Sequence, residues 1–201
     1  MTTLDFIRDK YSLDLNQPSP IEIPNIGRDD LAALFAELGF KVGAEIGVET
    51  GRYSETLCKA NPNLKLHCVD CWEIYTGYRD HLNQTRLGGL YEEAIERLTP
   101  YDCAIHRLFS MEYAAHVCGN SLDFVYIDAN HEIPWVLEDI YWWAKKVRPG
   151  GIVSGHDYYE CTWTHRPRSH VKYAVDCYTQ AFRLKPWFLA DTSWFWVKRE
   201  Y

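Results

Sequence analysis

Residues 43–55, GAEIGVETGRYSE, run from a predicted β-strand through a tight turn into a predicted helix. Gly47 and Gly51 bracket the turn, and glycine lets a backbone bend sharply and approach a ligand closely. Asp70 ends the next predicted strand, about 20 residues after Gly51, where an acidic side chain can accept hydrogen bonds from both hydroxyls of a ribose. Together these features predict a site for a nucleoside-bearing cofactor. The plainer alternative is a tight turn and an acidic helix cap.

Around this segment, predicted strands and helices alternate along the chain. We expect strands over 41–48, 64–69, 103–108, 122–127 and 152–154, separated by helices over 53–60, 90–98, 111–118 and 134–147. Further helices are expected over 31–38 and 171–182, and two closing strands over 187–189 and 194–198. Strands separated by helices form parallel sheets that are covered on both faces. The pattern therefore predicts an α/β fold, a Rossmann-like, mostly parallel seven-stranded sheet with an antiparallel C-terminal hairpin.

The segment before this alternation, residues 1–28, contains three prolines and is expected to be an irregular arm or lid. Residues 29–201 then form a single cofactor-binding domain. Within it, residues 72–89 are expected to form a long polar and aromatic loop.

Composition excludes several classes of partner. The formal net charge of −7 over 201 residues argues against nucleic acid, because phosphate binding needs a basic surface. No apolar run can cross a bilayer and no signal-peptide core is present, so we expect a cytoplasmic protein without a membrane partner. The seven cysteines are scattered, and the C-x-x-C of Cys68 and Cys71 has no second pair at zinc spacing, so reduced thiols are expected.

The acidic residues of the first strand and turn discriminate between cofactors. Glu45 lies inside the strand, and Glu49 takes the place of the middle glycine in the dinucleotide pattern. A carboxylate at that point would face the pyrophosphate of NAD, where close backbone approach is needed. S-adenosylmethionine carries an amino acid and a sulfonium in place of phosphates, so it tolerates these carboxylates.

A second set of polar residues follows the fourth and fifth predicted strands. Asp128 and His131 follow one strand, and His156 and Asp157 follow the next. Ligands of α/β sheets lie at the carboxyl ends of the strands, and oxygen and imidazole donors suit a divalent ion that leaves positions open for substrate. Alternatively, Asp128 holds the amine of the cofactor or caps a helix, and the histidines are hydrogen-bonded cleft residues.

These blocks resemble the class I S-adenosylmethionine-dependent methyltransferases, most of all methyltransferase family 24, which includes metal-dependent sugar O-methyltransferases. The resemblance covers residues 41–158 and is carried by E-x-G-x-x-x-G (45–51), HCVD (67–70), FVYIDANH (124–131) and RPGGIVSGHDY (148–158). It implies that Glu45, Gly47 and Gly51 line the methionine end of the cofactor, and that Asp70 binds the ribose of the cofactor. It also implies that Cys71 and Trp72 lie beside the adenosine, and that Ser110 and Met111 form the turn that contacts adenine.

The resemblance further implies that Asp128, His156 and Asp157 bind Mg²⁺, or Mn²⁺ in its place, and that His131 is the general base. Metal-dependent relatives usually carry a carboxylate or an amide where this chain has His156, so its ligand role is the weaker inference. The expected reaction is methyl transfer from S-adenosylmethionine to a hydroxyl of a small acceptor, a sugar or a phenol.

The acceptor side is expected to be an aromatic and basic rim over the site. Its candidate residues are Trp72, Tyr75, Tyr78, Trp163, His165, Arg166, Arg168 and His170. An ordinary solvated loop over 158–170 explains these residues equally well. Two other functions stay open: an NAD-dependent oxidoreductase on the same fold, and a non-catalytic accessory protein that keeps the cofactor site. The oligomeric state is open as well, a homo-oligomer included.

Overall fold

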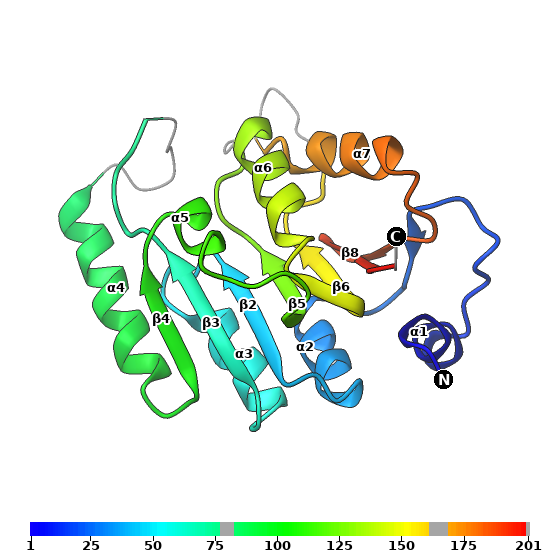
Figure 1. Ribbon diagram of the computed structural model, residues 1–201, viewed down its shortest axis with the longest axis horizontal. Helices are drawn as coiled ribbons and strands as arrows, with labels where there is room; N and C mark the ends of the chain where they lie inside the picture. The colour runs from blue at the N-terminus through cyan, green and yellow to red at the C-terminus, as the bar shows by residue number, and fades with distance from the viewer. Residues whose placement is uncertain (77–82, 161–168, 200–201) are drawn as a thin grey trace.

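The computed structural model describes residues 1–76, 83–160 and 169–199. Within these ranges, eight strands form one sheet in the order β1-β7-β8-β6-β5-β2-β3-β4 (Figure 1). The strands are β1 (Ile21–Glu22), β2 (Val42–Ile46), β3 (Lys65–Asp70), β4 (Cys103–Arg107), β5 (Leu122–Ile127), β6 (Val147–Gly155), β7 (Phe188–Ala190) and β8 (Ser193–Val197). Only β8 runs antiparallel to its neighbours, β6 and β7. The predicted α/β fold, a mostly parallel sheet closed by an antiparallel hairpin, is confirmed, with eight strands among the described residues in place of the expected seven.

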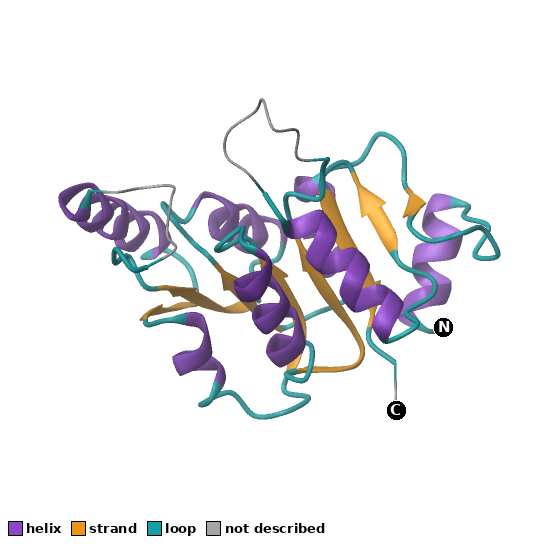
Figure 2. Ribbon diagram, turned by 90° about the horizontal axis from the view of Figure 1, so that it is seen from above, coloured by secondary structure: helices purple, strands orange, loops and turns teal. Residues whose placement is uncertain are grey.

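Helices cover both faces of the sheet, as Figure 2 shows from above. The helices are α1 (Thr3–Tyr11), α2 (Arg28–Glu37), α3 (Arg52–Ala60), α4 (Gln84–Leu98), α5 (Ser110–Ala114), α6 (Ile133–Trp143) and α7 (Val171–Ala181). Side chains of α1 to α4 pack into one buried apolar cluster, and those of α5 to α7 pack into a second on the opposite face. None of the described helices combines the length and the apolarity that a membrane span requires.

The N-terminal segment is ordered rather than irregular, which corrects the sequence expectation. Thr2 and Asp5 cap α1 reciprocally, and Ile7 of this helix is completely buried. Strand β1 then adds to the edge of the sheet, where the amides of Ile21 and Ile23 donate to carbonyls of the β7 region. Sequence pattern missed this strand because two residues carry no periodicity, and its partner is more than 160 residues away.

Several element boundaries also differ from expectation, most of all the starts of α4 and β6. Helix α4 begins at Gln84, inside the expected loop, because the Asn83 side chain caps it by accepting from the Arg86 amide at 3.2 Å. Strand β6 begins at Val147 instead of residue 152, and its pairing with β5 shifts register between Leu122 and Phe124. Proline lacks an N–H and is tolerated in a sheet at such irregular positions, which explains how β6 runs through Pro149.

Backbone hydrogen bonds align the carboxyl ends of the central strands. The Gly47 amide donates to Val69, the Asp128 amide to Ile46 at 2.7 Å, and the His156 amide to Ile127. Gly47 has φ of +87°, and a Cβ on it would lie 2.1 Å from the Asp128 carbonyl oxygen. The turn after β2 therefore approaches the end of β5 more closely than any side chain permits.

Replacing Gly47 tests this close approach. Gly39 is a matched control, because its φ is +70° but a Cβ on it would meet nothing within 4 Å. We expect Gly39→Ala to lower the free energy of unfolding by about 1 kcal/mol through backbone strain alone. Gly47→Ala should lower it by roughly 3 kcal/mol, because overpacking adds to the strain. Urea unfolding measures both, and equal losses would contradict the close contact.

Candidate active site

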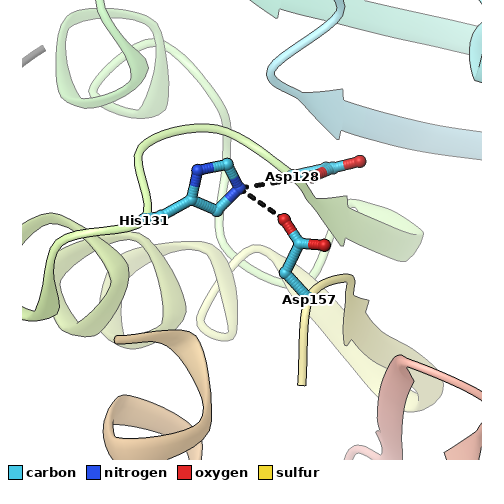
Figure 3. A group of neighbouring side chains, drawn as sticks. All are labelled: Asp128, His131 and Asp157. Carbon is cyan, nitrogen blue, oxygen red and sulfur yellow. Dashed lines mark ion pairs between the residues drawn. The ribbon is translucent and has the colours of Figure 1, made fainter. Parts of the chain in front are cut away.

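Three side chains converge at the carboxyl ends of β5 and β6: Asp128, His131 and Asp157 (Figure 3). His131 Nε2 lies 2.6 Å from Asp157 Oδ2 and 3.9 Å from Asp128 Oδ1. One donor atom from each residue lies within 4.8 Å of the others. All three side chains are about one-fifth exposed, but both ring nitrogens of His131 are themselves buried.

His156 joins this group from the other side of Asp157. Its Nδ1 lies 2.9 Å from Asp157 Oδ1 and 4.0 Å from Asp128 Oδ2. Its Nε2 is 3.0 Å from the Thr192 hydroxyl in the β7–β8 hairpin, which orients the ring. Asp157 is thus held between two imidazoles, and the four residues singled out in the sequence are neighbours.

The two imidazoles set the charge of Asp157. Burial would raise the pKa of this carboxyl, but hydrogen bonds and charge from His131 and His156 outweigh burial and hold the pKa well below its usual range. Asp157 therefore stays ionised at any physiological pH.

The donor set fits a divalent cation. Ligand atoms about 2.1 Å from one ion lie at most about 4.2 Å apart, and the distances from His131 Nε2 to both carboxylates satisfy this limit. Carboxylate oxygens with imidazole nitrogen are ordinary ligands for Mg²⁺ or Mn²⁺. The three-residue cluster contains His131, which the sequence interpretation reserved for the base. His156 Nδ1, at 2.9 Å from Asp157 and 4.0 Å from Asp128, satisfies the same distance limit.

Arg28 is a site residue that the sequence interpretation missed. Its guanidinium Nη1 lies 3.4 Å from Asp128 Oδ2 and stands over the Tyr53 ring. Tyr53 Oη in turn donates to the Arg28 carbonyl at 2.8 Å. Arg28 begins α2, outside every recognisable motif, so only the packing of α2 on α3 brings it to Asp128.

Glu45 lies beneath the cluster, in β2, and is only 2% exposed. Ser54 of α3 donates a hydrogen bond to it. Burial raises the pKa of Glu45 to about 8, a rise that the Ser54 bond opposes and the nearby Asp128 reinforces. At neutral pH this side chain is therefore mostly an uncharged acid.

Asp70 organises the glycine turn. Its Oδ2 accepts from the amides of Val48 and Glu49, at 2.9 and 3.0 Å, and its Oδ1 accepts from the Trp72 amide at 2.9 Å. A carboxylate offers about four acceptor positions, so the turn uses most of them. The sequence assigned Asp70 to a ribose, and in this structure it also shapes the loop on which that ribose would rest.

Trp72 braces the same turn from within. Its ring is 1% exposed, packs against Tyr91, and donates from Nε1 to the Glu49 carbonyl at 2.8 Å. This burial excludes Trp72 from the expected surface rim. Its place beside the adenosine stays a prediction. Its neighbour Cys71 is half-buried, and burial raises the pKa of its thiol to about 11, so it is not ionised.

Two further predicted cofactor positions lie at the ends of helices. Gly51 caps α3 with φ of +75°, and a Cβ on it would come within 3.1 Å of Leu98. Ser110 begins α5, where its hydroxyl donates to Asp139 and accepts from Trp143 Nε1, so it ties the turn after β4 to α6. Met111 is half-buried against the second apolar cluster.

An aromatic surface lies beside the glycine turn. Tyr75 makes T-shaped ring contacts with Phe109 and Trp135, and its Oη accepts from the Asn130 side chain at 3.0 Å. Phe109 and Trp135 were not predicted. His170, expected in the rim, instead donates its amide to the His131 carbonyl at 2.7 Å. The other expected rim residues, Tyr78, Trp163, His165, Arg166 and Arg168, lie outside the described residues.

Comparisons with known proteins agree with this geometry. The model of methyltransferase family 24, described as "Methyltransferase domain", matches residues 44–158, more than half of the chain. A search of curated proteins gave no match.

Solved structures share the fold at low identity. A Staphylococcus aureus protein provisionally described as a caffeoyl-CoA O-methyltransferase is 14% identical, with a TM-score of 0.61 over 97% of this chain and 90% of that one. The O-methyltransferase TomG from Streptomyces achromogenes, solved with SAM, is 18% identical, with a TM-score of 0.59 over 95% and 86%. The N-methyltransferase NodS from Bradyrhizobium japonicum is 14% identical, with a TM-score of 0.56 over 86% and 95%.

The family match covers the glycine turn, Asp70, Asp128, His131 and the His156-Asp157 pair together. The chain therefore belongs to the class I S-adenosylmethionine-dependent methyltransferases, as a member of methyltransferase family 24.

Proposed function

We propose that this methyltransferase transfers a methyl group from S-adenosylmethionine to a hydroxyl of a small acceptor, a sugar or a phenol. His131 acts as the base, and Asp128 and Asp157 hold a divalent ion. The observation that carries the proposal is the convergence of His131 Nε2 with both carboxylates at the edge of the sheet where the glycine turn lies. Structural neighbours include both O- and N-methyltransferases. The proposal that the acceptor atom is an oxygen is therefore argued from the residues of the site and not from the neighbours.

The chemistry needs little from the protein beyond position and a proton acceptor. The sulfonium already activates the methyl group, so the acceptor oxygen must be held in line with it, about 3 Å away. A neutral His131 can take the hydroxyl proton near pH 7. Because His131 Nε2 donates to the ionised Asp157 carboxylate at 2.6 Å, the hydroxyl proton would go to Nδ1, and Asp157 would stabilise the imidazolium that forms. A bound divalent ion would lower the pKa of the acceptor hydroxyl.

Two rival functions remain distinguishable by experiment. Membership in a methyltransferase family speaks against an NAD-dependent oxidoreductase, and binding of S-adenosylhomocysteine but not NADH in calorimetry would dismiss it. A non-catalytic accessory protein would bind S-adenosylhomocysteine equally well. Turnover of radiolabelled methyl donor with an acceptor panel separates it from an enzyme.

The cofactor assignment is tested at Asp70. We expect Asp70→Ala to weaken S-adenosylhomocysteine binding more than tenfold in isothermal titration, because each hydrogen bond to a charged acceptor contributes roughly 1.5–3 kcal/mol. Asp102→Ala is the control. Asp102 is an exposed aspartate directly before β4. If the Asp70 variant folds normally and binds with unchanged affinity, Asp70 is not part of the cofactor site.

The base assignment is tested at His131. His131→Gln should lower kcat by about 10²- to 10⁴-fold, because proton transfer in the transition state loses its acceptor. S-adenosylhomocysteine binding should stay intact, because the glycine turn and Asp70 are unchanged. His116→Gln, at an exposed histidine, is the control. Near-normal turnover of the His131 variant would remove it from the mechanism.

The metal is tested by chelation. Exhaustive EDTA dialysis should abolish turnover, and Mg²⁺ or Mn²⁺ should restore it, while S-adenosylhomocysteine still binds. Asp157→Ala should reproduce the loss, and His156→Ala should do so less completely. If Asp128 instead holds the cofactor amine, Asp128→Ala weakens cofactor binding and chelators have no effect. Full activity after dialysis would falsify the metal proposal and leave His131 as base.

A further inference from the structure

A cavity of about 590 Å³ opens at the carboxyl ends of β1 and β7. Its described lining consists of residues 22–27, Leu189 and Asp191. This volume lies within the usual range for small-molecule sites, about 300–1,000 Å³. The motifs of the family lie elsewhere in the chain. Most of the cavity wall is formed by residues 22–27, to which the sequence analysis assigned no catalytic or binding role.

None of Asp128, His131 and Asp157 lines the cavity, but two of its wall residues directly precede residues that contact the site. Gly27 in its wall precedes Arg28, whose guanidinium contacts Asp128. Asp191 in its wall precedes Thr192, whose hydroxyl lies 3.0 Å from His156 Nε2. Because β1 and β7 run parallel to β5 and β6, all four strands end at the same edge of the sheet.

The order of the strands separates this cavity from the cofactor turn. The glycine turn and Asp70 follow β2 and β3, whereas the cavity follows β1 and β7, and the cluster after β5 and β6 lies between them. A molecule in the cavity would therefore reach the cluster from the side opposite to the methyl donor. An in-line transfer needs its acceptor on that side.

The charges of the cavity indicate what it binds. Glu22 and Asp191 are exposed carboxylates, and within the described ranges neither has an ion-pair or hydrogen-bond partner. The described lining contains no lysine, arginine or histidine, and Ile23 and Leu189 supply buried apolar walls. Carboxylates form their strongest hydrogen bonds with cationic donors and repel other anions.

We propose that this cavity binds the methyl acceptor, and that the acceptor carries a protonated amine beside its hydroxyl groups. Glu22 and Asp191 hold the ammonium group, and a hydroxyl of the same molecule reaches His131. This inference rests on the proposed function, because it assigns the acceptor of that reaction.

Three matched probes test the charge preference: methyl glucoside, its 2-amino-2-deoxy analogue, and the methyl glycoside of glucuronic acid. Saturation-transfer NMR with the S-adenosylhomocysteine complex measures their binding, and radiolabelled methyl donor measures turnover. The amino probe should bind at least tenfold more tightly than the acidic one, with the neutral probe between them. Failure of the amino probe to bind, or tighter binding of the acidic probe, would overturn the proposal.

Charge removal shows whether the two carboxylates cause the preference. The double variant Glu22→Gln/Asp191→Asn should cut the amino-over-acid preference to less than twofold. Asparagine suits position 191, where φ is +53°, because it tolerates the left-handed region. Glu92→Gln/Glu96→Gln removes two exposed charges from α4, beside the opposite edge of the sheet, and should keep the full preference. A preference retained in the first variant would contradict the assignment of Glu22 and Asp191.

Blocking the cavity separates this inference from the proposed function. A Cβ on Gly27, a residue of the cavity wall, would meet nothing within 4 Å, so Gly27→Phe adds bulk to the wall without a clash at its Cβ. We expect the KM of the amino probe to rise at least tenfold, with unchanged S-adenosylhomocysteine affinity. Unchanged acceptor kinetics would place the acceptor elsewhere while leaving the methyltransferase assignment intact. If the unmodified protein itself does not bind S-adenosylhomocysteine, the proposed function is refuted instead.

Discussion

The contact between the Gly47 turn and the backbone of Asp128 is the constraint on which the site depends. A Cβ at position 47 would lie 2.1 Å from the Asp128 carbonyl oxygen, so the two strand ends meet without any side chain between them. The same contact places the turn expected to hold the cofactor directly against the first acidic residue of the Asp128–His131–Asp157 cluster. Hydrogen bonds from Asp70 to the Val48 and Glu49 amides then hold the turn in shape.

Burial and pairing together reduce the repulsion between carboxylates at this edge of the sheet. Glu45, Asp128 and Asp157 would repel one another if all were ionised and unpaired. Burial keeps Glu45 mostly uncharged, with a pKa of about 8, whereas two imidazoles keep Asp157 ionised. Arg28 faces Asp128. The site thus retains ionised oxygens at its surface, where a cation or a proton acceptor is useful, and a neutral acid beneath them.

Under the proposed function, the sheet would separate the cofactor from the acceptor. The residues that match the cofactor motifs follow β2, β3 and β4, and the cavity lined by residues 22–27 follows β1 and β7. The histidine and carboxylate cluster lies between them. The N-terminal segment contributes to this edge of the sheet, since it supplies strand β1, part of the cavity wall and, at its end, Arg28.

The sequence by itself determined the alternation of strands and helices, the glycine turn, and the identity of the residues that end β2, β3, β5 and β6. These features are local: periodicity, glycine spacing and the residue that follows a strand are all visible within short windows. From them the parallel sheet and the meeting of Asp128, His131, His156 and Asp157 could be predicted.

Only the tertiary structure decided the rest, because it depends on contacts between distant parts of the chain. The pairing of β1 with β7, the approach of Arg28 to Asp128, and the burial of Trp72 have no signature in any short window. Tertiary packing also gave Asp70 its three backbone partners and neutralised Glu45, since hydrogen bonding and desolvation are set by what surrounds a side chain and not by its place in a motif.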